Sequence, residues 1–319
     1  KNILITGGTG SFGNAFCKYV TKKYKKIKKV VIYSRDEFKQ YQMQKLFPYK
    51  NFRFYLGDVR DKSRLLRALD TIDYVIHAAA LKQVDKAEEN PMETIKTNVL
   101  GAQNVIECSL DSKVSNVIAL STDKASSPIN LYGATKLCSD KLFVTANNIK
   151  GNKKIKFSVV RYGNVLGSRG SVLPVFLKQK EKNVFTITHE DMTRFNITLN
   201  EGVEFVDWAI CNNFGGEIFV PKIPSFKVTD LVKAISPKGK IKIIGIRKGE
   251  KIHEEMVSES ESLNTIETNK RYIILSNSTE NEFNQILKYH KGKKIKTRFR
   301  YTSELKNNLI NTQKIKEIL

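Results

Sequence analysis

Tyr132 and Lys136 are the residues whose types and spacing most directly suggest chemistry. They stand four positions apart, so a helix would place both on one face, where a lysine ammonium can lower the pKa of the phenol toward neutrality. Such a phenol is a general base that can remove a hydroxyl proton while hydride leaves the carbon. Ser121 and Thr122 end an expected strand eleven and ten residues before Tyr132, and the hydroxyl of Thr122 can orient the same substrate oxygen.

A glycine-rich turn near the start of the chain predicts where a dinucleotide binds. Gly7, Gly10 and Gly13 lie between an apolar strand and a helical stretch that begins near Asn14. Glycine permits a tight turn and lets backbone N–H groups approach a pyrophosphate at the helix N-terminus. The alternative is a tight turn without a ligand. The cofactor contacts expected here are Gly7, Thr9, Gly10, Ser11, Phe12 and Gly13.

The end of the second strand favours NADP over NAD. An NAD enzyme often has an acidic residue there for the ribose 2′-hydroxyl, whereas Arg35 offers a permanently charged donor for a 2′-phosphate. Ser34 and Lys39 are additional donors. Asp36 either contacts the cofactor or, together with Glu37, complements a helix dipole.

Residues after later strands complete the expected cofactor site. Asp58 and Val59 close the third strand, where a carboxylate can accept from the adenine amino group. Ala78 and Ala80 close the fourth, where small side chains leave room for the dinucleotide. The remaining cofactor contacts that we predict are Lys82, Tyr132, Lys136 and Val165.

Short β-branched runs alternate with longer helical stretches over the first half of the chain. This alternation is typical of an α/β fold, a Rossmann-like doubly wound parallel sheet, in which ligands bind beyond the carboxyl ends of the strands. We predict an NADP-binding domain over 1–165 and a smaller α/β substrate-binding lobe over 166–319, with some later segments returning to the first domain. The predicted strands are 3–5, 30–33, 52–55, 74–76, 117–120 and 157–160.

The formal charge of +23 and the pI near 9.7 invite a nucleic-acid hypothesis, but no recognition element accompanies them. Basic runs over 22–29 and 288–300 are interpreted as solvated surface lysines, whose field would also attract a polyanionic substrate. We therefore expect no nucleic-acid partner.

No apolar run approaches the roughly 20 residues that span a bilayer, so we expect no membrane partner and a cytoplasmic location. Four scattered cysteines are interpreted as buried, reduced thiols. The four histidines show no metal-ligand spacing, and no metal is expected.

Several longer motifs together resemble a known family. Over most of its length the chain is similar to the extended short-chain dehydrogenases, and more closely to the soluble inverting UDP-N-acetylglucosamine 4,6-dehydratases of the pseudaminic acid pathway, which serves flagellin glycosylation. The motifs that carry the resemblance are His77-Ala-Ala-Ala-Leu-Lys82, Lys96-Thr-Asn98, Ser121-Thr-Asp-Lys-Ala125, Pro128-Ile-Asn-Leu-Tyr-Gly-Ala-Thr-Lys136, Arg161-Tyr-Gly-Asn164-Val, Gly167-Ser-Arg-Gly-Ser171, Met192-Thr-Arg194-Phe and Gly245-Ile-Arg247-Lys-Gly-Glu250-Lys.

The pair Asp123-Lys124 implies inversion, because retaining relatives carry Asp-Glu at this place. The resemblance implies that Tyr132 removes the C4 hydroxyl proton during hydride transfer to NADP, that Lys124 removes the C5 proton, and that Asp123 protonates the departing C6 hydroxyl. We expect a neighbouring Lys136 charge and desolvation to lower the pKa of Lys124. The alternative for Lys124 is an ion pair with Asp123.

The same resemblance assigns UDP-sugar contacts in the second lobe. Guanidinium groups suit a diphosphate and a carboxylate suits ribose hydroxyls. Each of these residues has an alternative role in a surface or inter-lobe ion pair. The substrate contacts that we predict are Lys82, Thr122, Tyr132, Asn164, Arg169, Gly170, Ser171, Val172, Arg194, Arg247 and Glu250.

Family members form homo-oligomers, hexamers included, so the resemblance also implies a homo-oligomer. Within the same fold, a 4-epimerase or reductase would use Tyr132 and Lys136 without requiring Asp123-Lys124. A nucleotide-sensing or nucleic-acid-binding protein on a Rossmann framework is the alternative from another class.

Overall fold

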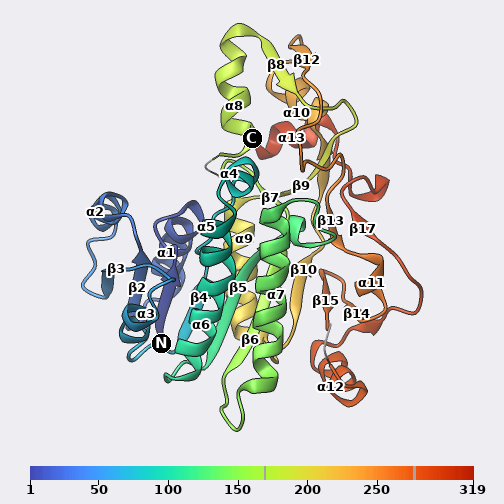
Figure 1. Ribbon diagram of the computed structural model, residues 1–319. Coiled ribbons are helices and arrows are strands. Elements are labelled where there is room, and N and C mark those ends of the chain that lie inside the picture. Colours follow the sequence, from blue (N-terminus) through green and yellow to red (C-terminus); the bar gives the residue numbers. More distant parts are fainter. Residues whose placement is uncertain (169, 276–277) are drawn as a thin grey trace.

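A computed structural model describes residues 1–168, 170–275 and 278–319 (Figure 1). Its centre is a large β-sheet, in which the pairs from β3 to β10 are parallel and those from β10 to β16 antiparallel. Within the described ranges the sheet has, in spatial order, β16 (Lys293–Lys294), β14 (Thr265–Glu267), β15 (Arg271–Ile274), β10 (Ile218–Pro221), β6 (Lys156–Tyr162), β5 (Asn116–Thr122), β4 (Tyr74–His77), β1 (Asn2–Thr6), β2 (Lys29–Ser34) and β3 (Phe52–Leu56).

The doubly wound parallel sheet predicted from the sequence is confirmed. Each predicted run lies inside one of the strands β1 to β6. All of these except the edge strand β3 bury β-branched residues on both faces, as parallel strands covered by helices do. The domain boundary at residue 165 stays a prediction. Strands β10, β14, β15 and β16, all later in the chain, pair into the same sheet.

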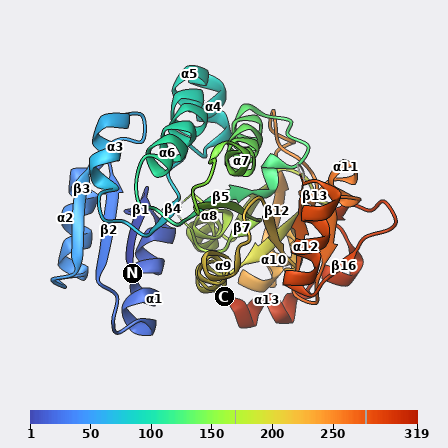
Figure 2. The same ribbon diagram turned by 90° about the horizontal axis from the view of Figure 1, so that it is seen from below.

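Helices cover both faces of the sheet and enclose two apolar cores (Figure 2). One face carries α3 (Lys62–Ala68), α6 (Gly101–Leu110) and α7 (Leu131–Ile149), with α4 (Val84–Glu89), α5 (Pro91–Ile95) and the π-helical turn η1 (Lys96–Leu100) beside them. The other carries α1 (Ser11–Lys23), α2 (Glu37–Leu46), α9 (Leu199–Asn212) and α12 (Glu280–His290).

The first helix begins at Ser11, three residues before the expected start, because Gly10 already has the extended backbone of an N-cap. This shift places the helix N-terminus directly after the glycine-rich turn.

A second lobe stands beyond the carboxyl ends of the parallel strands, at the top of Figure 1. Its own apolar core includes Phe176, Phe185, Leu231 and Ile315. Its elements are β7 (Asn164–Val165), α8 (Val172–Gln179), η3 (Lys180–Lys182), β8 (Val184–Ile187), β9 (Thr193–Ile197), β11 (Ser225–Lys227), α10 (Val228–Ile235), β12 (Lys240–Ile243), η4 (Lys306–Asn308) and α13 (Thr312–Ile318).

The segment between the sheet and this lobe holds β13 (Glu255–Val257), α11 (Glu259–Ser262) and β17 (Tyr301–Thr302), and β13 pairs with β17. The C-terminal strand β17 therefore holds β13, the strand that leads from the second lobe back to the sheet.

The cysteine prediction is corrected in part. All four thiols are unpaired, but Cys138 and Cys211 are exposed, because they fall on the outer faces of α7 and α9. Among the described helices, none combines the length and apolar character needed to cross a membrane.

Candidate active site

A cavity of about 1030 Å³ opens at the carboxyl edge of the sheet, and the second lobe forms its far wall. It gathers nearly all of the predicted site residues. Gly13 does not line it, and Arg169 lies outside the described residues. Those that line it are Gly7, Thr9, Gly10, Ser11, Phe12, Ser34, Arg35, Asp36, Lys39, Asp58, Val59, Ala78, Ala80, Lys82, Thr122, Asp123, Lys124, Tyr132, Lys136, Asn164, Val165, Gly170, Ser171, Val172, Arg194, Arg247 and Glu250.

The glycine-rich turn is packed so closely that side chains would not fit. Gly7 has φ +63°, and a Cβ there would lie 2.8 Å from the backbone of Ala79. A Cβ on Gly13 would lie 2.0 Å from the carbonyl oxygen of Gly8, so Gly13 holds helix against turn instead of facing the cavity. The turn leaves the N-terminus of α1 accessible, where backbone N–H groups can bind an anion.

Charged residues that follow β2 line the part of the cavity beside the glycine-rich turn. Arg35 lies 3.4 Å from the carboxylate of Asp58 and is half-exposed. Asp36 caps α2 by accepting a hydrogen bond of 2.9 Å from the Lys39 N–H, and it also pairs with the Lys39 ammonium. The helix-terminal role considered for Asp36 is therefore present, and its contact with the cofactor stays a prediction.

Tyr132 and Lys136 occupy one buried face of α7, whose first turn is capped by Asn130 accepting from the Gly133 N–H at 2.8 Å. The pKa expectation for this pair is wrong. Burial raises the pKa of Tyr132 to about 12, although Lys124 and the hydroxyl of Thr122 oppose the shift. The Lys136 ammonium instead donates to the carbonyl of Leu120 at 2.7 Å.

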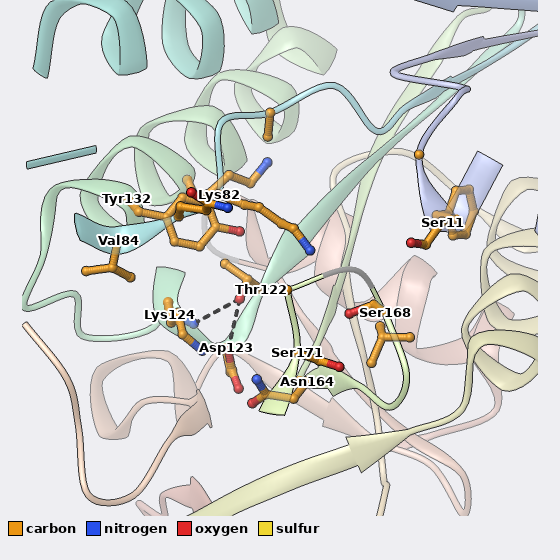
Figure 3. Close-up of a pocket in the computed structure, with 18 of the residues that line it drawn as sticks. Ser11, Lys82, Val84, Thr122, Asp123, Lys124, Tyr132, Asn164, Ser168 and Ser171 are labelled. Carbon is orange, nitrogen blue, oxygen red and sulfur yellow. Dashed lines mark hydrogen bonds and ion pairs between the residues drawn. The ribbon is translucent and has the colours of Figure 1, made fainter. Parts of the chain in front are cut away.

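Asp123 and Lys124 follow β5 in the 3₁₀ turn η2 (Asp123–Ala125) and lie in the cavity beside Thr122 and Tyr132 (Figure 3). Thr122 donates to Asp123 Oδ1 at 2.9 Å. Asp123 is buried, and its Oδ2 makes no hydrogen bond to any described residue. Burial raises the pKa of the Asp123 carboxyl against the opposing effect of Lys124, which favours the protonated acid.

The expectation of a lowered pKa for Lys124 is also wrong. Burial acts in that direction, but the carboxylates of Asp123 and Glu254 outweigh it and raise the pKa of the Lys124 amine. Lys124 Nζ lies 3.1 Å from Asp123 Oδ1 and 3.0 Å from Glu254 Oε1. The contact with Asp123 named as the alternative is present, and Glu254 adds a second one. Because the pKa of Asp123 is raised and that of Glu254 is lowered, Glu254 is the more strongly anionic of the two partners.

Arg194 brings a guanidinium into the cavity from β9. It donates to the carbonyls of Thr193 and Ile252 at 2.7 and 3.0 Å, and it lies 3.4 Å from Glu250. Arg247 is exposed in the loop after β12, where its backbone N–H donates to the Glu250 carboxylate at 3.4 Å. Two cationic side chains and one carboxylate thus face the cavity from the second lobe.

The walls between turn and lobe contain small and polar groups. Asn164 begins β7, and Ser171 precedes α8 with its hydroxyl buried and without a partner among the described residues. Within the same ranges, no three His, Cys, Asp or Glu side chains gather as ligands for a metal.

Glu254 is a site residue that sequence reasoning missed. It is 2% exposed, lines the cavity and contacts Lys124. The adjacent motif over 245–251 placed this segment near the substrate, but nothing in the spacing of the sequence pairs residue 254 with residue 124.

The parallel sheet, the glycine-rich turn before α1, and a buried tyrosine and lysine one turn apart on α7 define an extended short-chain dehydrogenase/reductase with a Rossmann fold. The resemblance stated from the motifs is thereby confirmed. The chain belongs to the family described as "Polysaccharide biosynthesis protein", whose profile matches residues 3–276.

Comparisons with individual proteins agree with this placement. The chain is 53% identical over 310 residues to a protein of Campylobacter jejuni named UDP-N-acetylglucosamine 4,6-dehydratase (inverting), covering 95% of this chain and 92% of the relative. It is 42% identical to a Rickettsia bellii protein named UDP-glucose 4-epimerase, covering 100% and 95%. The solved structure of Pen from Bacillus thuringiensis superposes with a TM-score of 0.88 at 38% identity, covering 100% and 96%.

Proposed function

We propose that the protein is an inverting UDP-N-acetylglucosamine 4,6-dehydratase. The observation that carries the proposal is the Asp123-Lys124 pair in the cavity beside Tyr132, because an alcohol oxidation alone needs no acid and amine at that place. The relative from Campylobacter jejuni that bears this name and aligns over 95% of the chain supports it.

A nicotinamide cofactor fits the cradle formed by Gly7 and Gly10, which line the cavity, while Gly13 holds α1 against the turn. When bound, it accepts a hydride from the sugar and returns it. We propose NADP, because Arg35, Ser34 and Lys39 supply donors for a 2′-phosphate at the end of β2. The packed turn holds the pyrophosphate at the N-terminus of α1.

Tyr132 removes the proton of the C4 hydroxyl in this proposal, with Thr122 orienting the oxygen. Because burial raises the pKa of the phenol to about 12, the phenolate must be stabilised by nearby positive charge. Lys124 and the Thr122 hydroxyl oppose the rise of the phenol pKa. Lys136, on the same face of α7, and a bound nicotinamide cofactor would add positive charge there.

Lys124 and Asp123 carry the elimination. The C4 ketone acidifies the C5 proton, which passes to the Lys124 amine, and Asp123 gives its proton to the C6 hydroxyl so that water leaves. The raised pKa of Asp123 supports its role as an acid. Its Oδ2 is buried without a hydrogen-bond partner among the described residues, so the carboxyl must turn toward the cavity to reach the C6 hydroxyl. After hydride has been returned to C6, a proton from solvent water reaches C5 from the opposite face, which gives inversion, and Tyr132 releases the C4 proton to water.

The second lobe binds the UDP moiety in this proposal. Arg194 and Arg247 face the diphosphate, and Glu250 accepts from the ribose hydroxyls. Lys82 and Asn164 contact the sugar from the first domain. Gly170, Ser171 and Val172, at the start of α8, line the cavity beside it.

The test is to incubate the purified protein with UDP-N-acetylglucosamine and to identify the product by NMR. The expected product is UDP-2-acetamido-2,6-dideoxy-β-L-arabino-hex-4-ulose, which shows a C6 methyl signal and the inverted C5 centre. A product that retains the C6 hydroxymethyl group would contradict the proposal.

A 4-epimerase is the second candidate, favoured by the Rickettsia bellii relative that bears that name over the whole chain. An epimerase would invert C4 and leave C6 unchanged, so the same NMR experiment separates the two. A homo-oligomer, a cytoplasmic location and a place in pseudaminic acid synthesis stay predictions.

A further inference from the structure

A carboxylate from the second lobe reaches the chemical centre of the first domain. Glu254 Oε1 lies 3.0 Å from Lys124 Nζ and 3.9 Å from Arg194 Nε. The side chain is 2% exposed, and its Oε2 has no hydrogen-bond partner among the described residues. The substrate-binding and chemical parts of the cavity meet at this residue.

The backbone of Glu254 is fixed from the C-terminal segment. Its N–H donates to the hydroxyl of Ser303 at 2.9 Å, and the Ser303 N–H donates back to the Glu254 carbonyl at 2.8 Å. The Ser303 hydroxyl also lies 2.7 Å from that of Thr193 on β9. Glu254 is therefore held in place independently of its contact with Lys124.

Lys124 is surrounded by charge that keeps it an ammonium. Asp123 and Glu254 contact it directly and raise its pKa, whereas the Arg194 guanidinium on β9 acts in the opposite direction. The phenol of Tyr132 faces it from α7. Burial acts to raise the pKa of Glu254, but Lys124, Arg194 and Lys251 outweigh it and lower that pKa, so at rest Glu254 is a carboxylate and Lys124 an ammonium. Yet a lysine that removes a carbon-bound proton must first be a neutral amine, so the ammonium proton needs an acceptor.

We propose that Glu254 is a positioning residue for Lys124, which it holds from the second lobe and from which it takes a proton to form the neutral amine. The inference rests on the proposed role of Lys124 as the base at C5. Asp123 cannot serve as this acceptor in the same step, because it must keep a proton for the C6 hydroxyl.

The proton balance closes over one turnover. An N–H bond of the Lys124 ammonium breaks and an O–H bond forms on Glu254. Lys124 then takes the C5 proton, and Asp123 gives its proton to the C6 hydroxyl, which leaves as water. Lys124 next passes a proton to Asp123 and recovers one from Glu254, since both carboxylates contact the same nitrogen. The proton that Tyr132 took from the C4 hydroxyl balances the one returned to C5.

The test compares Glu254→Gln and Glu254→Asp with wild type. Gln keeps a hydrogen-bond acceptor but takes no proton, so we expect kcat to fall by about a hundredfold with a much smaller change in KM. The Glu254→Asp variant keeps the negative charge but places it farther from Lys124, so it should retain an intermediate kcat. The matched control is Glu255→Gln, because Glu255 is equally buried but contacts Arg300 and Ser127 instead of Lys124.

A second measurement does not depend on turnover. Acylation of Lys124 by acetic anhydride, followed by mass spectrometry over a range of pH, reports the fraction of neutral amine. Removing one carboxylate charge should move the midpoint to lower pH by about one unit in Glu254→Gln, by less in Glu254→Asp, and not in Glu255→Gln.

Two results would overturn the inference. One is a Glu254→Gln enzyme with wild-type kcat and pH profile. The other is an unchanged Lys124 labelling midpoint in a folded Glu254 variant. If the Gln variant does not fold, the midpoint of the Asp variant alone decides the matter. If wild type releases no 6-deoxy product, the proposed function fails, and the labelling experiment still judges the contact between Glu254 and Lys124 separately.

Discussion

The guanidinium of Arg161 lies 3.3 Å from the carboxylate of Asp140, and both side chains are completely buried beneath the cavity. Asp140 follows Lys136 by one helical turn on α7, and Ser121 donates to it at 2.8 Å. On its other side Arg161 lies 3.0 Å from Glu261. A buried cation thus holds the helix that carries Tyr132 against the segment that leads to the second lobe.

Replacing Arg161 with Met should destabilise the fold strongly, because it leaves the carboxylates of Asp140 and Glu261 without their cation. We expect the free energy of unfolding, measured by urea denaturation, to fall by about 3–5 kcal/mol. The comparison is Lys314→Met, which breaks an exposed pair with Glu317 and should cost less than about 1 kcal/mol. Equal losses in the two variants would show that burial of the Arg161 pair adds nothing.

Gly13→Ala should abolish binding of the dinucleotide. The new Cβ would lie 2.0 Å from the Gly8 carbonyl oxygen, so the glycine-rich turn must move away from α1. Fluorescence titration with NADPH measures the effect. Lys18→Ala, at an exposed position of α1 that does not line the cavity, is the control and should bind NADPH like wild type.

Arg35→Ala should weaken NADP more than NAD. If the half-exposed guanidinium of Arg35 binds the 2′-phosphate, its loss should raise the Kd for NADP by about tenfold, which corresponds to about 1.4 kcal/mol. The Kd for NAD, measured by calorimetry on the same variant, is the internal control. Parallel changes for both dinucleotides would argue against this role.

Lys124→Ala should stop formation of the 6-deoxy product while the cofactor remains bound, because the variant removes the amine at C5 and leaves the glycine-rich turn intact. Product NMR and cofactor fluorescence measure the two effects. Lys96→Ala, at an exposed lysine of η1, should behave like wild type. Appreciable dehydration by Lys124→Ala would contradict the assignment.

Acidification should destabilise the protein through His77. Burial lowers the pKa of His77 to about 3, against roughly 6.5 in the unfolded chain. Both states are neutral above pH 6.5, but below it only the unfolded chain takes up the proton, so stability falls as pH falls toward 3. Between pH 7.5 and 5.5 this contribution is about 1.4 kcal/mol.

The measurement for His77 is urea denaturation at both pH values. The loss on acidification should be smaller by that amount in His77→Asn, whereas His189→Asn, which changes a partly exposed histidine, should keep the wild-type loss. An unchanged loss in His77→Asn would reject the assignment.

Local features of this protein could be predicted from its sequence because the interacting groups are neighbours along the chain. Helix geometry alone places Tyr132 and Lys136 on one face, and the backbone of a glycine-rich turn is decided within 7–13. The alternation of apolar strands and helices predicts the parallel sheet, and the sheet brings the residues that follow its strands to one edge.

The protonation states of the site residues depend on contacts between residues that lie far apart along the chain. Glu254 contacts Lys124 only because the later part of the chain folds over the carboxyl ends of the strands. In the same way, Arg161 on β6 contacts Glu261 only because α11 packs beside the sheet. The predicted pKa shifts of Lys124 and Tyr132 were therefore wrong in sign. A pKa depends on burial and on distances to charges in space, which spacing along a chain does not contain.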